Sequence, residues 1–69
     1  MNPAFQKGQS VRAWNRTFYD LGVVKSARFD ESEQGWRYVI RFRAGYDGNV
    51  SEVLVRAVEN NAPEVLERV

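Results

Sequence analysis

Apolar and polar residues alternate with a period of two over long parts of the chain, which predicts β-strands with one buried face. The clearest run covers residues 36–43, where the alternation is unbroken over eight positions. The large side chains on one face of this run are Trp36, Tyr38, Ile40 and Phe42. Residues 10–14 repeat the pattern on a smaller scale, with Val11 and Ala13 on one face. Both segments are therefore predicted to be half-buried strands.

A longer strand is predicted over residues 18–29, which are rich in aromatic and β-branched side chains near their start. Gly22 lies in the middle of this segment. A glycine inside a strand marks a bulge or a sharp bend. Because bent strands let a small sheet turn its corners, Gly22 favours a barrel.

Polar and glycine-containing segments separate these runs. Residues 15–17 are a polar connection, and residues 30–35 form an acidic loop that ends at a glycine. Residues 44–49 contain two glycines and an Asp-Gly step, a combination typical of a hairpin turn. The turns therefore divide the chain into short antiparallel strands.

A fourth strand is predicted over residues 50–56, with Val53 and Val55 on one face and Leu54 on the other. Four or five short strands of this kind can close into a small barrel. Closure would remove the exposed strand edges that otherwise promote aggregation.

The C-terminal part carries weaker signals. Residues 57–61 are interpreted as a tight turn or a short final strand, and Pro63 is placed to begin one helical turn. The predicted fold is all-β, a five-stranded SH3-like barrel with a short C-terminal helical turn. We expect one domain over 1–69, with its core at about 5–58 and a tail at 59–69.

The composition fits a single compact binding domain. Hydrophobic residues make up 43% of the 69 positions, enough for one core and too many for a disordered chain. The net charge is only +1, which is lower than expected for a protein that coats nucleic acid without sequence preference. Eight of the ten cationic residues are arginine, however, and arginine forms bidentate hydrogen bonds to phosphate and stacks on planar groups. The sequence is therefore compatible with a local basic patch.

Catalysis is not expected. The chain contains no histidine and no cysteine, which removes the commonest general base, the thiolate nucleophiles and the usual zinc ligands. The candidate carboxylates Asp30, Glu31 and Glu33 share one polar loop, where surface decoration is the simpler interpretation. We expect a binding module with no cofactor and no metal site.

The chain also lacks the signals of a membrane or secreted protein. No run of about 20 apolar residues predicts a membrane span. Residues 1–5 do not show the basic segment followed by an apolar stretch that is typical of a signal peptide. Absence of cysteine fits a reducing compartment, so we expect an intracellular protein with no membrane partner.

Three stretches carry a resemblance to a known group. Residues 5–14 read F-x-x-G-Q-x-V-x-A-W and are followed at 21–25 by L-G-V-V-K. Residues 38–46 read Y-V-I-R-F-R-A-G-Y. The first two are similar to the opening strands of many Tudor domains, and the third is similar to the chromo-barrel run Y-x-I-H-Y-x-G-W. The chain thus resembles the Royal superfamily of chromatin readers over about residues 5–58.

This resemblance implies recognition of methylated lysine on a histone tail, and hence a chromatin-associated, nuclear role. In that family an aromatic cage holds the methylammonium by cation–π attraction, worth about 0.5–2 kcal/mol per ring. The positions implied for the cage are Trp14, Tyr19, Asp20, Phe42 and Tyr46. Val50 stands where the family has a tryptophan. Trp14 and Tyr46 are also compatible with ordinary packing, because a small barrel needs large side chains to fill its core.

Three other functions stay open. The first is DNA or RNA binding through an arginine face of the third strand, where cations and aromatics interleave. The residues of that alternative site are Arg37, Arg41, Arg43 and Arg12. The second is a protein–protein interaction or oligomerisation module with an SH3-like groove. The third is the plasmid-type dihydrofolate reductase, to which residues 35–39 and 48–53 are loosely similar, although the reactive glutamine and tyrosine are missing.

Overall fold

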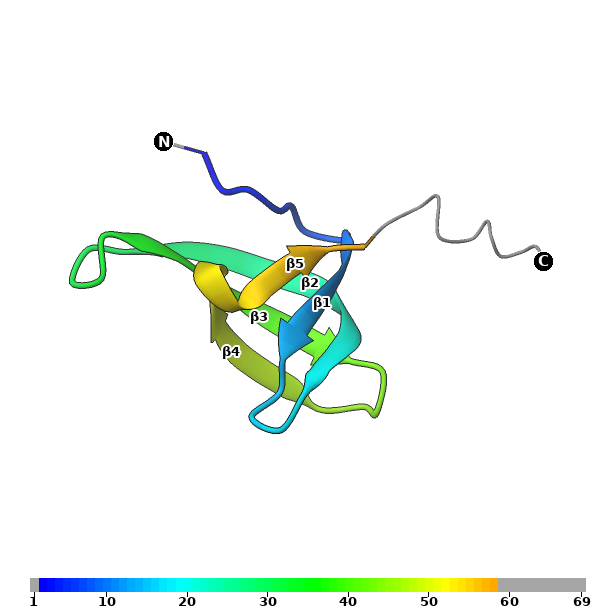
Figure 1. The fold of residues 1–69 in the computed structure, drawn as a ribbon. Helices are drawn as coiled ribbons and strands as arrows, with labels where there is room; N and C mark the ends of the chain where they lie inside the picture. The colour runs from blue at the N-terminus through cyan, green and yellow to red at the C-terminus, as the bar shows by residue number, and fades with distance from the viewer. Residues whose placement is uncertain (1, 59–69) are drawn as a thin grey trace.

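Within the part of the chain that the structure describes, the fold consists of strands and one short 3-10 turn. The structure, a computed structural model, describes residues 2–58, and the turn predicted at Pro63 lies outside them. The elements are β1 (Ser10–Trp14), β2 (Tyr19–Asp30), β3 (Gly35–Phe42), β4 (Asp47–Ser51), η1 (Glu52–Leu54) and β5 (Val55–Ala57) (Figure 1). The predicted all-β class is confirmed.

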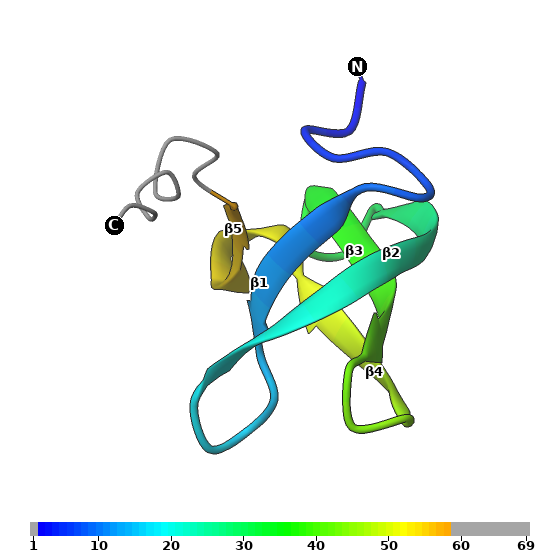
Figure 2. The same cartoon turned by 90° about the vertical axis from the view of Figure 1, so that its right-hand side faces the viewer.

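The five strands form one antiparallel sheet in the order β4-β3-β2-β1-β5. Strong curvature makes this sheet barrel-like (Figures 1 and 2). Strands β4 and β5 are its two edges, and among residues 2–58 no ladder joins them. The barrel predicted from the sequence is therefore present as a curved sheet that stays open between these edges.

The core lies on the inner face of the sheet and draws on every strand. Its buried side chains are Val11, Ala13, Val24, Tyr38, Ile40, Phe42, Val50 and Val55. The alternation predicted for β1 and β3 is confirmed, because the residues assigned to their apolar faces are buried, except for Trp36, which is partly buried. Full burial of each large apolar side chain contributes about 1.5–3 kcal/mol. Phe5 and Trp36 extend this core as partly buried neighbours.

Gly22 marks the corner at which β2 changes partner. Strand β2 pairs with β1 over residues 19–23 and with β3 over residues 22–30. A Cβ at Gly22 would lie 2.5 Å from Cγ2 of Ile40 and 2.9 Å from the carbonyl oxygen of Arg41. The only register shift between β2 and β3 in the described chain comes later, between Val24 and Ser26. The glycine therefore permits a close approach of two strands and is not itself the bulge.

The prediction of one continuous strand over residues 50–56 is wrong. Strand β4 ends at Ser51, and η1 turns the chain so that β5 can pair with β1. Because β4 and β5 lie at opposite ends of the sheet order, one straight strand could not serve both places. Val53 in η1 is 78% exposed and Val55 is buried, so they do not share a face. The Asp-Gly step at residues 47–48 begins β4 and lies outside the turn.

The N-terminal segment is fastened to the sheet through Tyr38 and Glu52. The Tyr38 hydroxyl accepts the backbone N–H of Phe5 at 3.2 Å and donates to a Glu52 carboxylate oxygen at 2.7 Å. The same carboxylate oxygen accepts the backbone N–H of Ala4 at 3.0 Å. The rings of Phe5 and Tyr38 meet edge to face, 5.7 Å apart. Burial, followed by the hydrogen bond to Glu52, raises the pKa of Tyr38.

Gly22→Ala is expected to lower the free energy of unfolding by about 1–3 kcal/mol, because the added methyl group overlaps Ile40 and the β3 backbone. Gly35→Ala is the matched control, since its added Cβ would meet nothing closer than a carbonyl oxygen of Glu33 at 3.9 Å. We expect the control to change stability by less than about 0.5 kcal/mol. Urea unfolding measures both variants. Equal losses of stability would contradict the close approach at Gly22.

Stability is expected to fall as the pH rises above 10. The pKa of Tyr38 is raised from its ordinary value of 10.0, so the folded chain keeps a proton that the unfolded chain has lost. This contribution is complete below pH 10 and is lost progressively as the pH rises toward the pKa of the folded state. Urea unfolding at about pH 9 to 11 should show a shallower decline for Tyr38→Phe than for the unaltered chain. An identical decline would contradict this assignment.

Candidate functional site

A groove lies between the end of β1 and the edge strand β4. The loops β1–β2 and β3–β4, which flank it, project from the same end of the molecule (Figures 1 and 2). Its volume is about 400 Å³. The residues that line it are Trp14, Asn15, Arg16, Phe42, Tyr46, Asp47, Gly48, Asn49 and Val50. The groove thus runs along β4, one of the two strand edges that the open sheet leaves without a partner strand among residues 2–58.

Three aromatic residues from three separate segments meet in this groove. Trp14 ends β1, Phe42 ends β3, and Tyr46 precedes β4. The rings of Phe42 and Tyr46 are stacked, with centroids 5.2 Å apart and planes at 30°. Phe42 is only 1% exposed, whereas Trp14 is 36% and Tyr46 is 45% exposed. Phe42 therefore supports the site from below, and Trp14 and Tyr46 offer ring surface to a ligand.

Tyr19 and Asp20, the other two residues implied for the cage, do not line the groove. The Tyr19 ring lies behind Trp14, edge to face at 5.3 Å. Asp20 is 5% exposed, and its carboxylate pairs with the Arg43 side chain at 2.8 Å and accepts the backbone N–H of Leu21 at 2.8 Å. Asp20 is thus committed to interactions within the protein and does not face the aromatic rings of the groove.

The acidic residue that does line the groove is Asp47, which the sequence had placed in a turn. Asp47 pairs in register with Arg41, and the two side chains form an ion pair. The hydrogen bond from Arg41 lowers the pKa of Asp47, so its carboxylate stays ionised at neutral pH. Drawing the hairpin from the sequence places Asp47 opposite Arg41, but it does not show that Asp47 reaches the groove.

The remaining wall of the groove is aliphatic and cationic. Val50, which replaces the tryptophan of the chromatin-reader pattern, is buried at 5% exposure and closes one side. Arg16 lies on the β1–β2 turn with a φ of 88°, a backbone conformation that favours glycine. The Asn15 side-chain oxygen holds this turn by accepting the backbone N–H groups of Thr17 and Phe18, each at 2.9 Å. A strained arginine is therefore held beside the aromatic rings.

A second depression, of about 450 Å³, lies over Gly22 and is more open to solvent. Phe42 is its only aromatic lining residue, and that ring is buried. Arg41 and Arg43 flank this depression, but each is paired with an aspartate. The groove at β4 is therefore the stronger candidate site.

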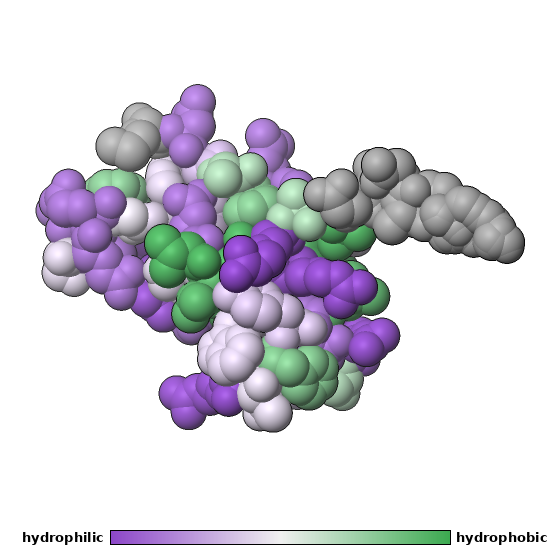
Figure 3. Space-filling model, in the orientation of Figure 1, coloured by the Kyte–Doolittle hydropathy of each residue, from purple (hydrophilic) through white to green (hydrophobic). Residues whose placement is uncertain are grey.

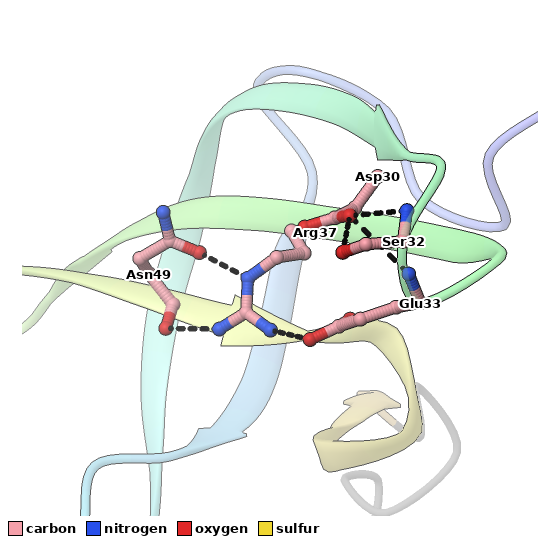
Figure 4. A network of polar contacts seen from close by, with 5 residues as sticks. All are labelled: Asp30, Ser32, Glu33, Arg37 and Asn49. Atoms are coloured by element: carbon pink, nitrogen blue, oxygen red, sulfur yellow. Dashed lines mark hydrogen bonds and ion pairs between the residues drawn. The ribbon is translucent and has the colours of Figure 1, made fainter.

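The arginine face predicted for the third strand is largely neutralised. Arg37 donates to a Glu33 carboxylate oxygen at 2.6 Å and to two oxygens of Asn49 at 2.7 and 3.2 Å (Figure 4). Arg41 and Arg43 are engaged by aspartates as described above. Of the four arginines of the alternative nucleic-acid site, only Arg12 forms no ion pair with a carboxylate of residues 2–58.

The acidic loop is a self-contained turn. One Asp30 carboxylate oxygen accepts the Ser32 hydroxyl at 2.6 Å and the backbone N–H groups of Ser32 and Glu33 at 2.9 and 3.3 Å (Figure 4). The hydrogen bond from the Ser32 hydroxyl is the main cause that lowers the pKa of Asp30. Among residues 2–58, no three acidic side chains gather closely enough to hold a metal ion.

No family model, curated protein or solved structure matches this chain. No helix within residues 2–58 has both the length and the apolar character that crossing a membrane requires.

Arg16→Gly is expected to raise the free energy of unfolding by about 1 kcal/mol, because glycine adopts a positive φ without steric cost. Thr17→Gly is the matched control at the neighbouring position, where φ is not positive. There the greater freedom of glycine in the unfolded chain should lower stability by about 0.4–1 kcal/mol. Urea unfolding compares the two. A loss of stability in Arg16→Gly equal to that in Thr17→Gly would rule out strain at Arg16.

Proposed function

We propose that this domain is a binding module that takes a methylated lysine side chain of a histone-type tail into the groove along β4. The proposal rests on the meeting of Trp14, Phe42 and Tyr46 around one groove at the open side of the sheet. Two exposed ring surfaces on a buried support are suited to a methylammonium group. Each well-placed ring contributes about 0.5–2 kcal/mol, depending on how far the cation is desolvated.

The ionised carboxylate of Asp47 supports a cationic ligand. Asp47 is one of the residues that line the groove, and its charge is only partly offset by Arg41, whose side chain is 48% exposed. A cation bound at the ring faces also gains from a carboxylate at the edge of the groove, without requiring deep burial.

The hydrogen bonds that Asp47 already accepts also bear on which methylation state of the lysine ligand the groove prefers. A lower methylation state retains an N–H that needs an acceptor, whereas a trimethylammonium needs none. Both carboxylate oxygens of Asp47 already face the Arg41 guanidinium, through its Nε and one terminal nitrogen. We therefore infer a preference for trimethyl-lysine over the lower states.

Isothermal calorimetry with a trimethyl-lysine peptide is the direct test. The unmodified peptide should bind at least about fivefold more weakly, since two rings together supply about 1 kcal/mol or more. A peptide with a neutral tert-butyl group in place of trimethylammonium has the same shape without the charge, and it should also bind weakly. Equal affinity for the neutral peptide would show that the groove is merely apolar.

Trp14→Ala should abolish binding of the trimethyl-lysine peptide and leave the fold intact, because Trp14 lies at a strand end and is 36% exposed. Phe18→Ala is the matched control: it also removes an exposed aromatic ring near the β1–β2 turn, but Phe18 does not line the groove. Calorimetry should give the unaltered affinity for that control. Unfolding of Trp14→Ala, seen by circular dichroism, would place Trp14 in the core and contradict the site.

A further inference from the structure

Two arginines lie directly opposite each other on the outer face of the sheet. Arg12 of β1 and Arg56 of β5 are register partners, and both are exposed. Side chains in directly opposite positions have Cβ atoms about 4.5–5.5 Å apart, and like charges in such a pair are destabilising. No carboxylate of residues 2–58 forms an ion pair with either one. The described chain thus concentrates positive charge here and does not relieve it internally.

One member of this pair is held in place by an aromatic ring. The Arg56 guanidinium lies over the Tyr19 ring, 4.4 Å from its centroid, and donates to the Tyr19 hydroxyl at 3.0 Å. Tyr19 in turn packs against Trp14. The stack explains why Arg56 can remain beside Arg12 without an acidic partner, and it pre-orders a donor that would otherwise have to be fixed on binding.

An exposed aromatic surface adjoins the arginines. Strongly hydrophilic side chains cover β1 and β5 (Figure 3). Directly below them in this view come side chains of intermediate hydropathy, and then an apolar cluster at the β1–β2 hairpin. Phe18 at that hairpin is 51% exposed and stacks on none of the other rings described here. A cationic strip next to a free ring is the combination by which proteins hold unpaired nucleotides, with phosphates on the cations and a base on the ring.

The charge balance of the described residues supports a polyanionic partner. Residues 2–58 contain nine lysines and arginines and six acidic residues. Three of these acidic residues are paired with Arg37, Arg41 and Arg43. The cationic residues that form no ion pair in this part of the chain therefore lie outside β3. The Arg12–Arg56 pair is the place where two of the remaining cations are adjacent in register.

From these observations we propose that the outer face of β1 and β5 binds single-stranded nucleic acid. Arg12 and Arg56 contact neighbouring phosphates, and Phe18 receives an unstacked base. This face is separate from the groove along β4, since neither arginine nor Phe18 lines the groove. The proposal therefore goes beyond methyl-lysine recognition and does not depend on it. A single strand fits better than a duplex because an exposed ring can stack only on a base that is not already paired.

The test is fluorescence anisotropy with labelled dodecamers of thymidine and uridine over a series of salt concentrations. Arg12→Gln and Arg56→Gln should each lower the slope of log K against log salt by about 0.7, the value for one phosphate contact on a single strand. Phe18→Ala should weaken binding about tenfold and leave the slope unchanged. Arg28→Gln is the matched control, because it removes the same charge from an exposed position of β2 that pairs with β3, away from β5.

Arg12→Glu separates binding from folding. The new carboxylate would face Arg56 across the sheet, so this variant should be at least as stable as the unaltered chain while losing the oligonucleotide. Equal effects of Arg28→Gln and Arg12→Gln would overturn the proposed face in favour of diffuse attraction. Duplex DNA bound as tightly as the single strand would overturn the stacking role of Phe18. Vesicles with phosphatidylserine that bind more tightly than the oligonucleotides, with the same dependence on Arg12, would assign the face to lipid headgroups.

Discussion

The close approach of β2 to β3 at Gly22 is the constraint on which the rest of the structure depends. Around this residue β2 leaves β1 and continues alone against β3. Because no side chain stands at the crossing, Ile40 can lie directly against the β2 backbone and the sheet can curve sharply. That curvature brings the end of β1 close to β4 although the two are not adjacent in the sheet. The groove is the space left between them.

The distribution of charge follows from the same pairing. Cross-strand partners on the outer face of β3 and β4 match Arg41 with Asp47, and the loop before β3 supplies Glu33 to Arg37. These pairs are at least partly exposed to solvent, so their contribution to stability is small. Their larger effect is on recognition, since they neutralise β3. The β1–β5 pairing has no such matching among the described residues, and positive charge remains where Arg12 meets Arg56.

Most of the fold could be predicted from the sequence, because burial follows the period-two pattern directly. Val11, Ala13, Tyr38, Ile40 and Phe42 are buried as the alternation requires. The prediction of a single strand over residues 50–56 failed because the apolar residues there continue the alternating pattern, although the chain has to cross from one edge of the sheet to the other. A three-residue 3-10 turn leaves no distinct signature in such a short stretch. The open side of the barrel was likewise invisible, since closure depends on tertiary distances.

The candidate site was predicted in part. Trp14, Phe42 and Tyr46 converge on one groove, whereas Tyr19 and Asp20 are drawn to Trp14 and Arg43 instead. Sequence reasoning could not separate Asp20 from Asp47, because each pairs with an arginine and only the tertiary structure shows that Asp20 is buried while Asp47 lines the groove. The alternation of polar and apolar residues also could not reveal that the Arg56 side chain lies over the Tyr19 ring, since 37 positions separate the two residues.

The most direct measurement is a set of intermolecular nuclear Overhauser effects in the complex with a trimethyl-lysine peptide. The account predicts contacts between the methyl protons of the ligand and the ring protons of Trp14 and Tyr46, with none to Phe18. Contacts confined to Phe18 and the β1–β2 turn, or a complete absence of contacts to aromatic protons at saturating peptide, would contradict the groove as the site of recognition.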